Sequence, residues 1–159
     1  MPADGIGALR FLVGRWRGTG TLRGRPVTSV SECHVSPSAP DALTLRITTL
    51  RDGTPIHEED IHWMTASGAV GAGGASGVAV RCVTRPRSDE EQIWRMRRPG
   101  AAPRWELTRP GYLWTIERTA DGYREVFETV AADGARTTVV QLTHVREDGA
   151  RAGAQAGDA

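Results

Sequence analysis

Hydrophobic and polar residues alternate along most of this chain, and that period of two is typical of half-buried β-strands. The alternating segments are rich in β-branched and aromatic residues, and turn signals such as Asp-Gly and Pro-Gly separate them. Only Ala8–Val13 predicts a short helix or turn, just before the strand around Trp16. The strands expected after it are Val27–Val35, Ala42–Leu50, Ile56–Met64, Val78–Val83, Glu91–Arg97, Arg104–Arg109, Tyr112–Glu117, Tyr123–Val130 and Thr137–Arg146.

About ten short strands joined by tight turns indicate an all-β fold, either an up-and-down barrel or a sandwich. We expect a single antiparallel up-and-down β-barrel of about ten strands, calycin-like, with a short N-terminal helix. The chain of 159 residues fits one domain, for which we take residues 1–148. Residues 149–159 are mostly alanine and glycine and predict a disordered tail. The stretch Gly68–Gly77 fits either a loop, which could cover a barrel mouth, or a weak edge strand.

The first predicted strand has an unusual inner face. Gly14, Trp16, Gly18 and Gly20 are spaced by two, so all four lie on one side of a strand. Glycine costs about 1 kcal/mol per residue inside a helix, which argues against a helix here. Bare backbone around one large ring suits the closed end of a small barrel, where strands bend sharply. We expect Arg146 to stack its guanidinium on Trp16 and seal that end.

Aromatic residues dominate the predicted inner faces of the other strands. The chain has five tryptophans, and the alternation puts nearly all of them inside. The rings either fill the barrel or line a cavity for a flat apolar ligand. A barrel of about ten strands encloses more space than side chains comfortably fill, so we expect a cavity. The residues expected to line it are Trp63, Trp94, Trp105, Tyr112, Trp114, Tyr123, Phe127 and Leu142.

The densest group of titratable residues is the segment His57–Trp63. Alternation places His57 and Glu59 on the face of Trp63, which we take as the inner face, and His62 on the other. A histidine beside a carboxylate can act as a general base, so His57 and Glu59 are catalytic candidates. The alternative is mixed charge that keeps a barrel mouth soluble. Histidines on opposite faces give no metal site from this strand, and we expect no metal elsewhere.

Two further polar residues fall on inner faces, where burial costs free energy unless a partner satisfies them. Glu125, between Tyr123 and Phe127, is either a buried carboxyl that acts as a general acid or the partner of an interior arginine. His144, in the last strand, is in phase with Leu142 and is placed as a metal or haem ligand inside a barrel would be. It can equally be a core histidine that bonds to a neighbouring strand or to pocket water.

Composition narrows the range of partners. The formal net charge of +1 gives no reason to expect nucleic acid. No apolar run reaches the roughly 18 residues needed to cross a bilayer, and no signal-peptide pattern is present, so we expect a cytoplasmic protein without membrane contact. Cys33 and Cys82 are too few and too distant for a disulfide framework or a zinc site, and we expect both to be small buried residues. The sequence leaves open whether two copies form a homodimer.

The segment Phe11–Gly20 contains the pattern Gly-x-Trp-x-Gly-x-Gly and resembles the opening of the nitrobindin-like haem-binding barrels. Gly53–Glu59 is loosely similar to a later strand of that family. The wider relatives are the calycins, which include lipocalins and fatty-acid-binding proteins, and in them the first-strand tryptophan packs against an arginine near the chain's end. The resemblance implies haem held by a histidine of the last strand, here His144, with nitric oxide binding and peroxynitrite isomerisation.

These observations predict a β-barrel that binds a small hydrophobic or planar ligand, with haem as one candidate. The alternative is a cofactor-free biosynthetic enzyme, a cyclase, isomerase or dehydratase, in which one of the four inner titratable residues moves a proton on a hydrophobic intermediate. Several calycin-like barrels of bacterial biosynthetic pathways resemble the chain in layout and catalyse such steps. A barrel filled completely by its tryptophans would instead be an interaction module without a ligand.

Overall fold

The computed structural model describes the backbone of residues 5–37, 39–70, 76–85 and 88–147, with side chains except at 40, 66–70, 76, 77, 79, 81–85 and 88–90. In this part of the chain one short 3-10 helix, η1 (Ile6–Leu12), precedes ten strands. Each strand predicted from the sequence is present, and most extend a few residues further. The strands are β1 (Gly14–Leu22), β2 (Arg25–Ser36), β3 (Ala39–Arg51), β4 (Thr54–Val70), β5 (Ser76–Arg85), β6 (Ser88–Arg97), β7 (Arg104–Arg109), β8 (Tyr112–Arg118), β9 (Gly122–Val130) and β10 (Arg136–Arg146).

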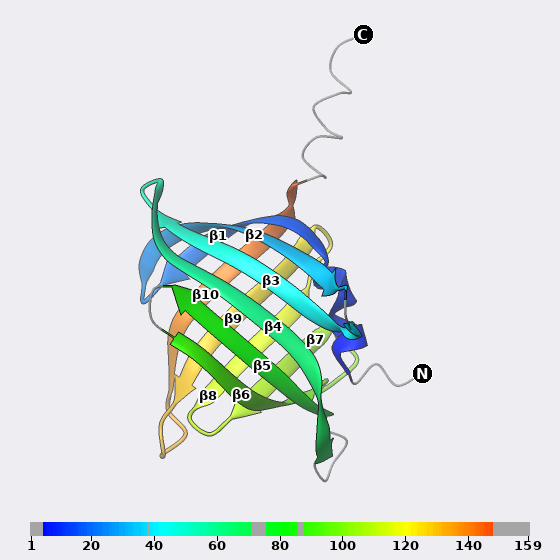
Figure 1. Ribbon diagram of the computed structural model, residues 1–159. Helices are drawn as coiled ribbons and strands as arrows, with labels where there is room; N and C mark the ends of the chain where they lie inside the picture. Colours follow the sequence, from blue (N-terminus) through cyan, green and yellow to red (C-terminus); the bar gives the residue numbers. More distant parts are fainter. Residues whose placement is uncertain (1–4, 38, 71–75, 86–87, 148–159) are drawn as a thin grey trace.

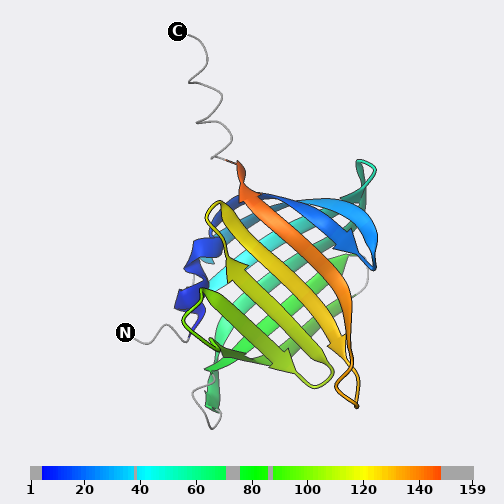
Figure 2. The same ribbon diagram turned by 180° about the vertical axis from the view of Figure 1, so that it is seen from behind.

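The ten described strands form one closed antiparallel barrel (Figures 1 and 2). Every strand pairs with its neighbour in sequence, and β1 also pairs with β10 to close the ring. The predicted all-β, up-and-down barrel with a short N-terminal helix is therefore confirmed. β4 ends at Val70 and β5 starts at Ser76. Both ends of the stretch Gly68–Gly77, which the sequence predicts as either a loop or a weak edge strand, therefore belong to strands. Its centre, residues 71–75, and the predicted tail, residues 149–159, lie outside the described residues.

The helix η1 closes one end of the barrel (Figure 2). Trp16 donates its indole N–H to the Leu12 carbonyl at 2.7 Å, and the Arg146 guanidinium lies 4.6 Å over the Trp16 ring. Arg146 also donates to the Phe11 carbonyl at 3.2 Å. The predicted seal of Trp16 by Arg146 is confirmed, and it ties η1 to β1 and β10. The side chains that η1 buries in the core are Ile6, Leu9 and Leu12.

The glycines of β1 let the strands on its two sides approach each other. Gly20 pairs with Val27 of β2 and with Leu142 of β10. A Cβ at Gly20 would overlap the backbone carbonyl oxygen of Gln141, so β10 could not lie where it does beside a larger residue. Gly18, two residues before Gly20 in β1, faces the barrel interior in the same way. Side chains from β2 and β10 therefore converge over bare backbone on the inner face of β1.

The end opposite η1 carries most of the tight hairpins (Figure 1). They connect β1 to β2, β3 to β4, β7 to β8 and β9 to β10, and each contains a glycine with positive φ, as such turns require. Within the described residues, η1 is the only helix, so no helix covers this end, which we call the mouth. None of the helical structure described is long and apolar enough to span a membrane.

Gly20→Ala should destabilise the barrel, because the added methyl group meets the Gln141 backbone, which cannot rotate away as a side chain can. Overpacking of this kind costs about 1–3 kcal/mol, measured as the free energy of unfolding in urea. Gly100→Ala is the control, since a Cβ there meets nothing within 4 Å. We expect it to change the free energy of unfolding by less than about 0.5 kcal/mol. Equal effects of the two substitutions would contradict the close approach of β10 to β1.

Candidate functional site

One side of the lumen is covered by packed aromatic rings. Trp63 of β4 reaches Trp114 of β8 with ring centroids 5.6 Å apart, although three strands separate β4 from β8. Trp94 lies 6.1 Å from both Trp114 and Phe127. Tyr112 completes the group at 5.7 Å from Phe127. These five residues, which we call the aromatic wall, make up most of the cavity lining expected from the sequence.

The facing side of the lumen has aliphatic and small side chains. Val27, Ile47 and Leu142, which we call the aliphatic wall, form a buried cluster that is separate from the cluster containing the aromatic wall. In the ring of strands, β3 and β8 have four strands between them on either side, so Ile47 and Trp114 belong to opposite walls. The two walls bound the lumen without packing into one cluster.

A buried carboxylate–imidazole pair joins β9 to β10 inside the barrel. His144 is 0% exposed, and its Nε2 lies 3.1 Å from Oε1 of Glu125. The other carboxylate oxygen of Glu125 accepts the indole N–H of Trp114 at 3.2 Å. The His144 ring stacks on Tyr123 with centroids 4.3 Å apart. The partner of Glu125 is thus an imidazole and not the interior arginine that the sequence left open.

The second nitrogen of His144 has no partner among the described residues. When Nε2–H donates to the Glu125 carboxylate, Nδ1 is a hydrogen-bond acceptor. Nδ1 and the Ser29 hydroxyl both lie against the bare backbone of Gly18, and the Ser29 hydroxyl is also buried without a hydrogen bond. A buried polar atom in this state costs about 1–3 kcal/mol. These two atoms therefore mark a position where a polar group of a ligand, or water, would bind.

His144 does not fit the role of a haem ligand that the family resemblance implies. Its Nε2 is engaged by Glu125 at 3.1 Å, and its Nδ1 faces the backbone of Gly18. One face of the imidazole is covered by the Tyr123 ring. An axial histidine must offer one ring nitrogen to an iron at the centre of a porphyrin, which needs far more room along that direction than a single polar group. We therefore assign His144 to the pair with Glu125 and derive no chemistry through haem.

His57 and Glu59 form a second pair, on β4 toward the mouth. The Nε2 of His57 lies 3.4 Å from Oε2 of Glu59, and the two side chains are 39% and 23% exposed. They share a strand face with Trp63, as predicted, while His62 lies on the other face. The hydrogen bond with Glu59 raises the pKa of His57. In the ring of strands β4 stands opposite β9, so this pair and Glu125 come from strands on opposite sides of the ring.

Two of the residues expected to line the cavity pack at its closed end. Trp105 lies 5.3 Å from the ring of Phe11, a partly buried residue of η1. Tyr123 lies 5.0 Å from Trp16, edge to face, and its other neighbour is the stacked His144. Burial raises the pKa of the Tyr123 phenol, and the Glu125 carboxylate adds to that rise. Trp105 and Tyr123 are therefore part of the floor beneath the lumen.

Ser29 and Arg109 were not identified from the sequence, although both lie on the inner face. The available signal was strand alternation, which puts Ser29 in phase with Val27 and Arg109 in phase with Leu107. Nothing in the alternation separates Ser29 from the other small polar residues of its strand. Arg109 begins the turn signal Arg109-Pro110-Gly111, which predicts a hairpin and no ligand contact.

The described cysteine is a packing residue. Cys33 is a free thiol that is 1% exposed, and burial raises its pKa to about 12. Such a thiol is protonated at neutral pH and a poor nucleophile. The prediction of a small buried residue is confirmed for Cys33, whereas the side chain of Cys82 lies outside the described residues.

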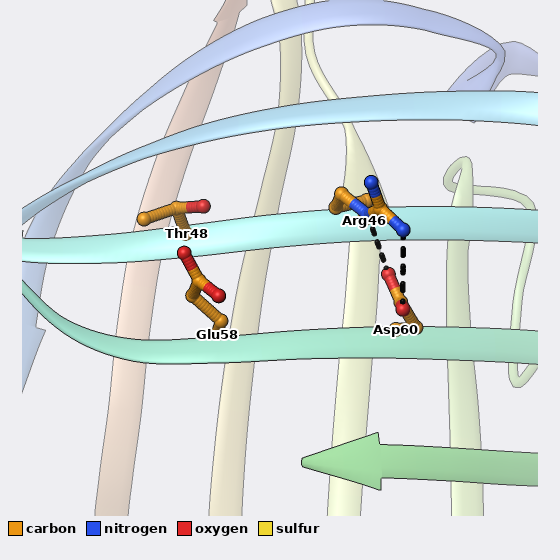
Figure 3. A pocket seen from close by; sticks show the side chains of 4 residues that line it. All are labelled: Arg46, Thr48, Glu58 and Asp60. Carbon is orange, nitrogen blue, oxygen red and sulfur yellow. Dashed lines mark hydrogen bonds and ion pairs between the residues drawn. The ribbon is translucent and has the colours of Figure 1, made fainter. Parts of the chain in front are cut away.

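A shallow depression on the outer surface of β3 and β4 is lined by polar residues (Figure 3). Arg46 and Asp60 form a bidentate pair across the two strands, with N–O distances of 2.8 and 3.4 Å. The Arg46 side chain is 71% exposed, and exposed pairs of this kind contribute little to stability. The depression lies outside the barrel and is separate from the lumen. The residues that line it are Arg46, Thr48, Glu58 and Asp60.

No protein-family model matches this chain, and no curated protein matches it in sequence. The chemistry of the lumen therefore has to be inferred from its own residues. They provide two apolar walls, a polar position at Ser29 and His144, and a carboxylate that orients the imidazole for proton transfer.

The His57–Glu59 pair predicts a pH dependence. Because Glu59 raises the pKa of His57, the imidazole should titrate above the usual histidine pKa of about 6.5. The pair stabilises the folded state fully at a pH below the pKa that His57 has in the unfolded chain. This stabilisation is lost as the pH rises through the higher pKa that His57 has in the folded protein. Glu59→Gln should lower the His57 pKa, measured by NMR of the imidazole protons, and Glu58→Gln on the outer face is the control. Equal His57 pKa values in the two variants would contradict the pair.

Proposed function

We propose that this barrel binds a small, flat and largely apolar molecule in its lumen. The observation that carries the proposal is the separation of the aromatic wall from the aliphatic wall. Side chains of a filled core pack into one cluster at high density, as they do at the closed end. We infer from the separation of the two buried clusters that a slot lies between them.

The lining indicates the chemistry of the ligand. Indole faces offer wide apolar surfaces, and burial of apolar area contributes about 25 cal/mol per Å², which favours flat rings between the walls. The Nδ1 of His144 would accept a hydrogen bond from a ligand hydroxyl, and the Ser29 hydroxyl can donate or accept. The indole N–H of Trp63 is also buried without a partner and would donate to a ligand oxygen. We therefore propose a ligand with one or two hydrogen-bonding groups on an apolar ring system.

The resemblance of Phe11–Gly20 to nitrobindin-like and other calycin barrels supports a ligand-carrying barrel. The placement of His144 argues against haem as that ligand, since Glu125 engages Nε2, and Nδ1 lies beside the Ser29 hydroxyl over β1, where a small polar group can reach it but a porphyrin iron cannot. We therefore do not extend the haem-linked activities of the nitrobindin-like family to this chain.

N-Phenyl-1-naphthylamine, a neutral flat probe that fluoresces in apolar surroundings, tests the slot. We expect saturable binding to the wild-type protein, with energy transfer from tryptophan. Ile47→Trp would put an indole into the slot and should weaken binding at least about tenfold, or about 1.4 kcal/mol. Val30→Trp adds the same ring to the outer face of β2, where Val30 is 47% exposed, and should leave binding unchanged.

Circular dichroism and thermal unfolding check that both tryptophan variants are folded. Val27→Phe fills the slot from the neighbouring strand and should also weaken binding, so the test does not depend on Ile47→Trp alone. Lack of saturable binding by the wild-type protein would contradict the proposal. Equal weakening by Ile47→Trp and Val30→Trp would contradict it as well.

The Glu125–His144 pair favours a second candidate function, acid–base catalysis on the bound molecule. The carboxylate holds the imidazole in one orientation and leaves Nδ1 as a base, which is how a second residue positions a catalytic histidine in other enzymes. The reaction class would be a proton shift in an isomerisation, dehydration or cyclisation of a hydrophobic intermediate. His57 and Glu59, the other two catalytic candidates, lie on β4 toward the mouth and would not act on the same atom as His144.

The flat compound 5-nitrobenzisoxazole tests this second function. A base removes the proton on its C3 while the ring N–O bond breaks, and the cyanophenolate product is followed by absorbance. A positioned general base contributes about 10²–10⁴-fold, so His144→Gln should lower the rate about a hundredfold, whereas His62→Gln should not change it. Glu125→Gln, which keeps a hydrogen bond to the imidazole but removes the charge, should lower the rate by a smaller factor. A wild-type rate that survives in both lumen variants would rule out this function.

A further inference from the structure

Two arginines point into the barrel at its mouth. Arg51 ends β3 and is in phase with Ile47 of the aliphatic wall, and Arg109 ends β7 and is in phase with Leu107. The guanidinium of Arg109 lies 4.2 Å over the ring of Tyr112 and is therefore continuous with the aromatic wall. The two side chains stand at the mouth end of the two walls that bound the slot.

Neither inward arginine has a counter-ion in the described part of the chain. The Nε atoms of Arg51 and Arg109 are both buried without a hydrogen-bond partner. The outward arginines of the same two strands differ, because Arg46 of β3 is 2.8 Å from Asp60 and Arg104 of β7 is 3.6 Å from Glu106. On each of these two strands, the outward arginine therefore has a carboxylate partner and the inward arginine has none among the described residues.

A partly buried guanidinium without a partner is unfavourable, and its planar set of donors matches the oxygens of a carboxylate or sulfonate. Glu59, the inward carboxylate of β4 near this end, already accepts the hydrogen bond of His57 at 3.4 Å. At the deep end, the Glu125 carboxylate would repel an anion. The charges along the slot therefore run from an anion inside to cations at the mouth.

We propose that the ligand is an amphipathic anion whose flat apolar body occupies the slot and whose acidic group binds Arg109 and Arg51 at the mouth. This inference rests on the proposed function, since it orients a ligand in that slot. Arg109 would act twice, stacking on Tyr112 with the face of its guanidinium and binding the anion with the edge.

Two fluorescent probes with the same apolar skeleton, one charged and one neutral, distinguish binding of the acidic group from binding of the apolar body. 8-Anilinonaphthalene-1-sulfonate carries a sulfonate on the N-phenyl-naphthylamine skeleton, and N-phenyl-1-naphthylamine is its neutral counterpart. We expect Arg109→Gln to weaken binding of the sulfonate at least about tenfold and to change binding of the neutral probe by less than about threefold. Arg51→Gln should act in the same direction, and Arg109→Lys should restore part of the sulfonate affinity. Arg95→Gln, on the exposed face of β6, is the control with the same loss of charge and should affect neither probe.

The outcomes distinguish this inference from the function on which it rests. If the wild-type protein binds neither probe, the proposed function fails and the inference fails with it. If it binds both probes and Arg109→Gln weakens both equally, or weakens neither, the slot stands and the anion site is wrong. If Arg109→Gln loses affinity for the sulfonate probe alone, and raised salt weakens sulfonate binding to the wild-type protein, the anion site is supported.

Discussion

The inner face of β1 has no side chains at Gly18 and Gly20, and the barrel interior is arranged around that gap. Side chains of β2 and β10 extend over the bare backbone, so Val27 and Leu142 flank Gly20 and join in one cluster. The same gap brings the Ser29 hydroxyl and Nδ1 of His144 to one place beside Gly18. Closure of the ring and the position of its polar atoms therefore depend on a single backbone constraint.

The polar interior is difficult to explain by stability alone. Replacement of both partners of a buried hydrogen bond by apolar groups can be nearly neutral or stabilising, so the pair of Glu125 with His144 is weak support for a purely structural role. The unpartnered Nδ1 beside it adds a further cost. At the mouth, Arg51 and Arg109 lack, among the described residues, the carboxylate partners that the outward arginines Arg46 and Arg104 of the same strands have. A bound molecule that satisfies these groups accounts for both features.

Strand alternation was enough to predict the barrel, because a period of two is easily recognised and most hairpins contain a glycine that fixes the turn. It also placed His57, Glu59, Glu125 and His144 on inner faces. The pairing of Glu125 with His144 could not be predicted, because contact across strands depends on register, and register follows from the whole ring. Glu125 pairs with Leu142 in the backbone ladder, which puts His144 diagonally beside it. The separation of the two walls likewise depends on which strands face each other after closure.

The central claim is that space for a ligand exists between the two walls. A crystal structure of the protein soaked with 2-bromonaphthalene tests it most directly, because anomalous scattering from bromine locates the compound without ambiguity. We predict a bromine peak in the lumen, between Trp114 and Ile47. The contrary result is a lumen without a peak, in which the side chains of these two residues are in van der Waals contact.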